Sequence, residues 1–235
     1  DNVGVSANGT GNILLHSQVA NVVVNAEVTS GSGYISVLGQ VHVSQSATGD
    51  ISTTGTGTID VAAATGAISM DDGAQSSTTA ANIRYQAQTD IALGGILAGA
   101  GNVSLTATEG HITDNGNAHA EVIADQLRLQ AGGNIGEAAN TNKGHLDTTV
   151  NDLTALAAGS EGIFLTNSQA EYMASSTSSL QKMLDALELP KPQLVINLLF
   201  SGGHDAWTKA NGPGGLDEGA ASWGAGTVSN RAAFL

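Results

Sequence analysis

Acidic side chains are the residues of this sequence with the clearest chemical potential, because paired carboxylates hydrolyse glycosides and clustered carboxylates bind calcium. One adjacent pair, Asp71-Asp72, precedes Gly73 and stands where a turn is expected after Met70. A solvated turn is the favoured interpretation of this pair, and a loop calcium site is the alternative. Other acidic residues of the repeat region are scattered along the chain, among them Asp50, Asp60, Asp90, Asp114 and Asp125.

Basic and metal-ligating side chains are sparse. Arg84 and Arg128 are the only Lys or Arg residues among the first 142, whereas a polysaccharide lyase needs a basic group that stabilises the developing anion. The chain has no cysteine, and its histidines show no metal-ligand spacing: His16, His42, His111, His119, His145 and His204. His204-Asp205 is interpreted as a polar loop, with a weak site as the alternative. The sequence therefore predicts no catalytic, cofactor-binding or metal-binding residue, and it favours a protein that is not an enzyme.

Two tryptophans near the C-terminal end are candidates for carbohydrate contact. Exposed Trp207 and Trp223 would stack on sugar rings, whereas buried ones would fill a small core, because a tryptophan buries a large apolar area. The second interpretation is favoured, so neither residue is assigned to a site.

The overall charge narrows the classes of partner. The formal net charge is −14, with only seven Lys or Arg residues. Nucleic-acid binding needs a basic surface that neutralises phosphates, and anionic membranes attract basic segments, so both partners are disfavoured. No run of about 18 apolar residues is present, and the sequence therefore predicts no transmembrane helix.

A short motif recurs over the first two thirds of the chain. Each copy has a Gly, Asn or other small or polar residue, then an apolar, a polar and another apolar residue, at 11–15, 33–37, 57–61, 81–85, 101–105, 125–129 and 151–155. In–out–in alternation is the signature of a strand with one buried face, and so short a strand must stack on its neighbouring copies. We therefore expect the central apolar residues to form one interior column: Ile13, Ile35, Ile59, Ile83, Val103, Leu127 and Leu153.

A second apolar series lies between these copies and has nearly the same period. Its members are Val23, Val43, Ile68, Ile91, Ile112, Ile135 and Ile163. Two interleaved series with one period predict a coil with at least two strands per turn. Gly and Asn before the strands are expected to supply positive-φ corners.

The same register predicts which side chains point outward. The middle residues of the first-series copies form this outward row: Leu14, Ser36, Asp60, Arg84, Ser104, Arg128 and Thr154. Asp60 and Arg84 should then be neighbours on adjacent turns and form a surface ion pair.

The composition changes after Phe164, where aromatic residues become frequent and all three prolines occur. We place a boundary near residue 170, with a parallel β-helix over 1–168 and a C-terminal segment over 169–235. Ser178 and Gln181 form a capping box that predicts one helix ending before Pro190, followed by a strand over 193–200. This segment is expected to cap the open solenoid end. Docking of another subunit is the alternative.

Residues 101–116 and 124–136 resemble the repeats of filamentous-haemagglutinin-type exoproteins. These are giant secreted adhesins of Gram-negative bacteria, often exported by two-partner secretion, and the resemblance covers roughly residues 10–166. It implies a right-handed parallel β-helix, an extracellular or cell-surface location and a role in attachment, cell–cell contact or biofilm cohesion. The Asn-Pro-Asn-type motifs of the family's secretion domain are absent from the sequence.

The expected fold is all-β, a right-handed parallel β-helix of about seven coils with a small α+β C-terminal cap. The expected function is that of a secreted adhesin or structural stalk segment, whose partners are a host or neighbouring cell surface, extracellular polysaccharide, or copies of itself. A self-assembling filament or surface-layer subunit is the first alternative, and a polysaccharide-active β-helix enzyme is the second. No cofactor is expected, apart from the calcium alternative at Asp71-Asp72.

Overall fold

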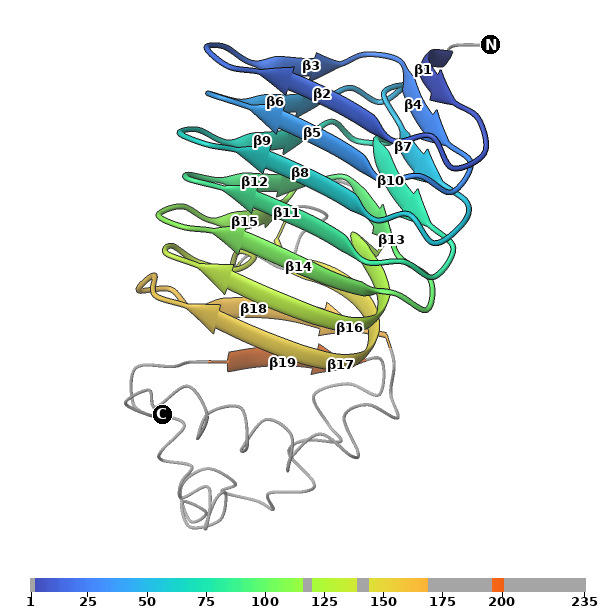
Figure 1. The fold of residues 1–235 in the computed structure, drawn as a ribbon. Coiled ribbons are helices and arrows are strands. Elements are labelled where there is room, and N and C mark those ends of the chain that lie inside the picture. Colours follow the sequence, from blue (N-terminus) through green and yellow to red (C-terminus); the bar gives the residue numbers. More distant parts are fainter. Residues whose placement is uncertain (1–2, 116–119, 139–143, 169–195, 201–235) are drawn as a thin grey trace, which may run out of the picture.

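The computed structural model describes residues 3–115, 120–138, 144–168 and 196–200, and this part of the chain is all-β. Parallel strands stack as a solenoid of about six turns, with the N-terminal turn at the top of Figure 1. The predicted fold class is confirmed for this region. The predicted helix after Ser178 and the tryptophans Trp207 and Trp223 lie outside the described residues.

The strands of each turn lie on three faces of the coil, rather than the minimum of two that the sequence required. The first face contains β2 (Ile13–Ser17), β5 (Ile35–Gly39), β8 (Ile59–Ala63), β11 (Ile83–Ala87), β14 (Asn102–Ala107) and the later parts of β16 (Val122–Ala131) and β17 (Leu146–Ala157). The second contains β3 (Val22–Val24), β6 (Val43–Gln45), β9 (Ile68–Met70), β12 (Ile91–Leu93) and β15 (Ile112–Asp114). The third contains β1 (Val3–Ala7), β4 (Glu27–Ser30), β7 (Ile51–Thr53), β10 (Gln75–Thr78), β13 (Gly95–Leu97) and the beginnings of β16 and β17.

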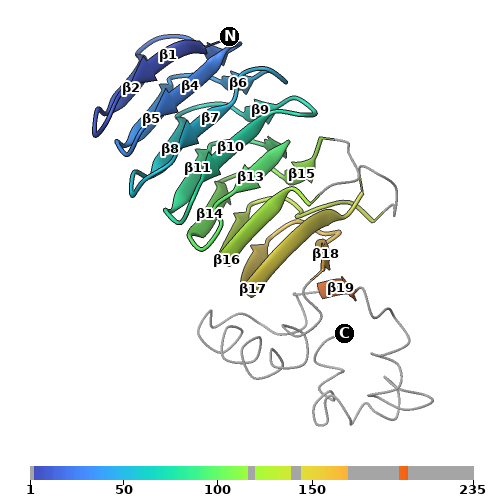
Figure 2. The ribbon, with the colours of Figure 1, turned by 90° about the vertical axis from the view of Figure 1, so that its right-hand side faces the viewer.

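Two long strands join the third face to the first. β16 pairs with β13 through its beginning and with β14 through its end, and β17 follows β16 along its length. Figure 2 shows β16 and β17 after the shorter strands of the earlier turns. The two faces therefore form one continuous sheet, which has 14 strands when β18 (Ile163–Asn167) and β19 (Ile196–Phe200) are included.

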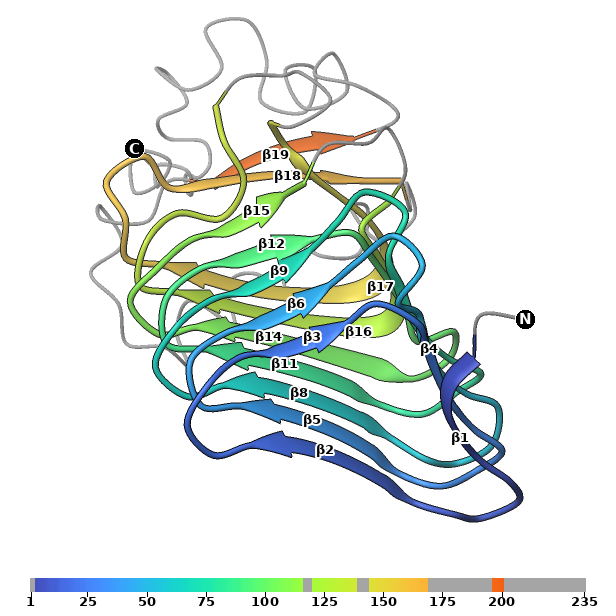
Figure 3. The same ribbon diagram turned by 90° about the horizontal axis from the view of Figure 1, so that it is seen from above.

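The coil is right-handed. Seen from the N-terminal end in Figure 3, the chain runs clockwise from β2 through β3 to β4 while it descends toward the later turns. This is the hand that parallel strand connections almost always adopt, because twisted strands pack back onto their sheet in that direction.

The predicted interior column of the first face is confirmed without a break. Each member pairs in register with its counterpart on the next turn, in the order Ile13, Ile35, Ile59, Ile83, Val103, Leu127 and Leu153. All seven are buried, from Ile35 with no exposed surface to Ile13 with 7%. Stacking of like residues about 4.8 Å apart therefore builds the core from strands that are individually too short to have one.

The second series is confirmed except at its first member. Val43, Ile68, Ile91 and Ile112 stack in register, and isolated bridges continue the column to Ile135 and Ile163. On the first turn, however, Val22 occupies this column opposite Val43, and Val23 is 56% exposed. The prediction at Val23 was wrong because Val22, Val23 and Val24 are consecutive, so hydrophobicity does not fix which one points inward.

The third face forms a column that the sequence pattern did not reveal. Its members are Val28, Ile51, Ser76, Ile96, Val122 and Thr148. Ser76 and Thr148 are fully buried polar residues, and they interrupt the apolar series by which the other columns were recognised.

Ser76 belongs to a buried hydrogen-bonded group inside the coil. Its Oγ lies 2.6 Å from the Tyr85 hydroxyl, which donates to Gln45 Oε1 at 3.1 Å, and Gln45 Nε2 donates to the Gln75 carbonyl at 2.8 Å. Tyr85 has no exposed surface. Because these polar atoms satisfy one another, the interior accommodates them at little cost.

The expected positive-φ glycines are present before β2, at Gly9 with a φ of 63°, and before β14, at Gly99 with a φ of 58°, but other glycines at these corners have a different role. Gly33 and Gly57 do not have positive φ values. A Cβ at Gly57 would lie 1.9 Å from the Gly33 carbonyl oxygen, and one at Gly33 would lie 2.0 Å from the Gly11 carbonyl oxygen. These corners therefore need glycine because the backbones of successive turns approach closely.

The strand predicted over residues 193–200 is present as β19 (Ile196–Phe200). β19 pairs in parallel with β18 (Ile163–Asn167), which in turn pairs with β17. The C-terminal segment thus adds a strand to the stack.

Candidate functional site

The outer surface of the first face carries three rows of side chains that run across the strands. The middle row is the predicted one, since Arg84 lies in register between Asp60 and Ser104, and Ser104 between Arg84 and Arg128. A flanking row precedes it on each strand and contains Asn102, Gln126 and Asp152 in register. A third row follows it and contains Gln86, Thr106 and Gln130. These rows exist because alternate residues of every strand point away from the core.

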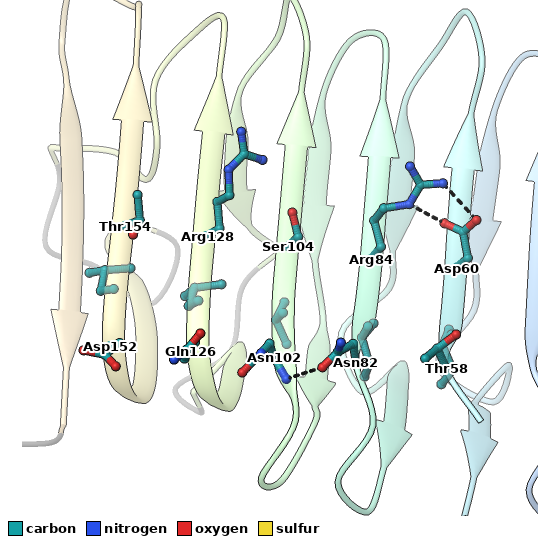
Figure 4. Close-up of a pocket in the computed structure, with 15 residues that line it drawn as sticks. Thr58, Asp60, Asn82, Arg84, Asn102, Ser104, Gln126, Arg128, Asp152 and Thr154 are labelled. Atoms are coloured by element: carbon teal, nitrogen blue, oxygen red, sulfur yellow. Dashed lines mark hydrogen bonds and ion pairs between the residues drawn. The ribbon is translucent and has the colours of Figure 1, made fainter. Parts of the chain in front are cut away.

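A groove of about 740 Å³ runs over this surface from β8 to β17. We call it the outer groove, and Figure 4 shows its polar side chains. The outward-facing residues that line it are Thr58, Asp60, Asn82, Arg84, Asn102, Ser104, Gln126, Arg128, Asp152 and Thr154. Four inter-strand steps of about 4.8 Å give the groove a length of roughly 19 Å.

The predicted ion pair between Asp60 and Arg84 is confirmed and lies at one end of the outer groove. Arg84 Nε donates to Asp60 Oδ1 at 2.8 Å and Nη2 donates to Oδ2 at 2.9 Å, a bidentate arrangement. The hydrogen bond to Asp60 raises the pKa of the Arg84 guanidinium. Nη1 donates to Gln86 Oε1 at 2.9 Å, so all three nitrogens of Arg84 have partners within the protein.

Arg128 is the other cation of the outer groove, and its surroundings differ. Its Nη2 donates to Gln130 Oε1 at 2.6 Å, in the same i to i+2 arrangement as Arg84 with Gln86. Among the described residues, no carboxylate pairs with Arg128, because the outward residue on the preceding turn is Ser104 rather than an aspartate. In Figure 4 both arginines lean toward the preceding turn.

The flanking row supplies amide groups along one side of the outer groove (Figure 4). Asn82 Oδ1 accepts the backbone N–H of Asn102 at 3.0 Å, which fixes the Asn82 side chain along the stacking direction. Asn12 Oδ1 accepts the N–H of Tyr34 in the same way near the N-terminal end. Asn102 and Gln126 are exposed. Their amides can donate and accept hydrogen bonds, as sugar hydroxyls do.

A second group of polar residues lies at the corner before the third face, where sequence reasoning found no pattern. Glu121 is 1% exposed, its Oε2 accepts the backbone N–H of Asp147 at 2.6 Å, and its Oε1 has no partner among the described residues. Burial raises the pKa of Glu121 to about 8, with smaller contributions in the same direction from the Asp114 and Asp147 charges and opposing ones from backbone hydrogen bonds. Glu121 is therefore protonated at neutral pH.

The remaining candidates fall in structural positions. Asp72 and Gly73 form the turn predicted after Met70, and Gly73 has a φ of 92°. His42 Nδ1 accepts the N–H of Ala67 at 2.9 Å, and His111 Nδ1 accepts that of Asn134 at 3.0 Å, so both histidines link successive turns.

Within residues 3–115, 120–138 and 144–168, no group of three or more His, Asp or Glu side chains is arranged to hold a metal ion. His119, His204 and Asp205 lie outside this part of the chain.

The described residues include no helix long and apolar enough to cross a membrane.

Comparison of the chain with models of known protein families, with curated proteins and with solved structures found no match.

Proposed function

We propose that this chain is a non-enzymatic segment of a secreted surface adhesin or stalk, which holds an attachment surface away from the cell. The observation that carries this proposal is the continuous register of the first face over seven stacked strands. A continuous hydrogen-bonded stack with a largely apolar core resists bending and local unfolding, because no inner turn can open without breaking pairs with both neighbours.

The outer surface of the stack supports the attachment role. The outer groove presents charged, amide and hydroxyl groups at regular intervals along the coil axis. The chain's acidic net charge of −14 favours solubility and repels nucleic acids and anionic membranes. The resemblance of residues 101–116 and 124–136 to filamentous-haemagglutinin-type repeats points to the same role.

Attachment is measured with beads that carry the full chain through a covalent linkage. We expect these beads to attach to a biofilm-forming Gram-negative bacterium or to cultured epithelial cells in greater numbers than beads that carry albumin. Attachment at the albumin level on both kinds of cell would refute the proposed function.

A further inference from the structure

We propose that the outer groove binds an extended glycan with sparse carboxylates, and that Arg128 together with Ser104 holds one of those carboxylates. The proposal rests on the attachment role proposed above and assigns it a ligand class and a pair of residues.

The coil itself contains a template for this contact. Arg84 on β11 binds the carboxylate of the outward residue that lies opposite it on the preceding turn, Asp60. Arg128 on β16 has the corresponding position, and it also donates to a glutamine two residues later, Gln130. The outward residue opposite Arg128 on the preceding turn is Ser104. Serine replaces the aspartate, which leaves room above the strand where a carboxylate from outside can approach the arginine.

The donors needed for such a contact are present. Arg128 is exposed, and its Nε and Nη1 have no hydrogen-bond acceptor among the described residues. A guanidinium forms two parallel hydrogen bonds to a carboxylate from Nε with Nη2 or from Nη1 with Nη2. Nη2 of Arg128 donates one hydrogen to Gln130, and its second hydrogen can complete one of these pairs. The Ser104 hydroxyl can add a third hydrogen bond. The protein's own Asp60–Arg84 pair shows that this geometry forms on the same surface.

The surrounding surface favours a glycan over a peptide. The backbone groups of β11, β14 and β16 are already paired with neighbouring strands, so an extended peptide lying across them would leave its own amides unpaired. A glycan has no such backbone, and its hydroxyls match the amides of Asn102 and Gln126. The roughly 19 Å length of the groove suits several consecutive sugars.

The net charge limits how many carboxylates the glycan carries. With a formal charge of −14 on the protein, a uniformly charged polyanion is repelled overall, and only Arg84 and Arg128 are cationic in the described region. Asp60 neutralises the first of these. A chain with neutral sugars between its uronic acids therefore fits the outer groove better than a fully charged one.

The test is calorimetric titration of the full chain with a hyaluronan octasaccharide, in which uronic acids alternate with neutral sugars. We expect binding that weakens about tenfold in Arg128→Gln, the loss of one charge-assisted contact. Ser104→Asp should weaken binding similarly, because it supplies an internal carboxylate to Arg128. Arg84→Gln is the matched control and should change the affinity less than about twofold, since that arginine is already paired.

Two further titrations test whether the carboxylates of the glycan make the contact. The same octasaccharide with its carboxylates reduced to alcohols should bind at least about tenfold more weakly. Asp60→Ser should release Arg84 and raise the affinity or the number of sites. Equal binding by Arg128→Gln, by the reduced glycan or by a glutamate-containing peptide overturns the inference, as does an absence of octasaccharide binding. If beads carrying the chain still attach to cells in that case, the proposed function stands and only the ligand assignment fails.

Discussion

Arg84 holds Asp60 from the adjacent turn through two hydrogen bonds of 2.8 and 2.9 Å, with the two side chains 53% and 30% exposed. The pair therefore joins residues that are 24 positions apart in the sequence, one full turn of the coil. It identifies the register of the stack, and its exposure limits its contribution to stability.

We expect the coupling energy between Asp60 and Arg84 to be no more than about 1 kcal/mol, because water and salt screen exposed pairs. A double-mutant cycle with Asp60→Asn and Arg84→Gln, measured by urea denaturation, gives this energy. Arg128→Gln serves as the control for losing an unpaired arginine. A coupling energy above about 2 kcal/mol would show that the pair is structurally important rather than a marker of register.

Truncation within the first-face column should be costly. Ile59 is 1% exposed and is stacked between Ile35 and Ile83, so Ile59→Ala should reduce the free energy of unfolding by about 2–5 kcal/mol. Leu14→Ala is the matched control on the same face, because Leu14 is 63% exposed, and should change stability by less than about 0.5 kcal/mol. Similar effects of the two substitutions would contradict the assigned inward and outward orientations.

The buried hydroxyl of Tyr85 should contribute measurably to stability. Tyr85→Phe removes the partner of Ser76 and Gln45 inside the coil, and we expect a loss of about 1–3 kcal/mol in the free energy of unfolding. Tyr34→Phe removes a hydroxyl from a side chain that is 57% exposed and should be nearly neutral. If both substitutions are neutral, the interior group is not the satisfied network described above.

Stability should fall with rising pH because of Glu121. Its pKa is near 8 in the folded chain and near 4.5 when unfolded, so the folded state binds the proton more tightly. The stabilisation is complete below about pH 4.5 and is lost as the pH rises through 8. Asp114 and Asp147 are the charges that act on this carboxyl.

Glu121→Gln isolates this contribution, since glutamine keeps an oxygen for the Asp147 N–H but does not ionise. The difference in urea midpoint between this variant and the native chain should increase in favour of the variant from pH 5 to pH 9. Glu109→Gln, at an exposed position, should show no such trend. A difference independent of pH would mean that Glu121 titrates as an ordinary surface carboxyl.

Periodicity predicted the columns of the first and second faces, because identical residue types recur wherever like residues stack. The register of these columns also predicted the Asp60–Arg84 contact, since it places the two residues opposite each other on adjacent turns. The third face was not recognised, since Ser76 and Thr148 are buried through hydrogen bonds rather than through apolarity. Val23 was placed inward because three consecutive valines satisfy either orientation.

The residues of the candidate sites could not be singled out from the sequence, because their properties depend on contacts in the folded coil. Arg128 and Ser104 are both members of the predicted outward row, but the absence of a carboxylate partner becomes visible only beside the paired Arg84. Glu121 has no sequence signal at all, since its burial results from packing at a corner between turns. Asp147, which acts on it, lies opposite it on the next turn, and Asp114 lies seven residues before it in the chain.

The central claim is that attachment takes place on the outer surface of the first face, and selective blocking of that surface tests it most directly. The chain has no cysteine, so Ser104→Cys and Ser77→Cys each provide one thiol for labelling with a polyethylene glycol maleimide. Both serines are half-buried and point outward, one on the first face and one on the third. We predict that label at position 104 abolishes attachment of chain-bearing beads to cells, whereas label at position 77 leaves it unchanged. Equal attachment by the two labelled proteins would contradict the claim.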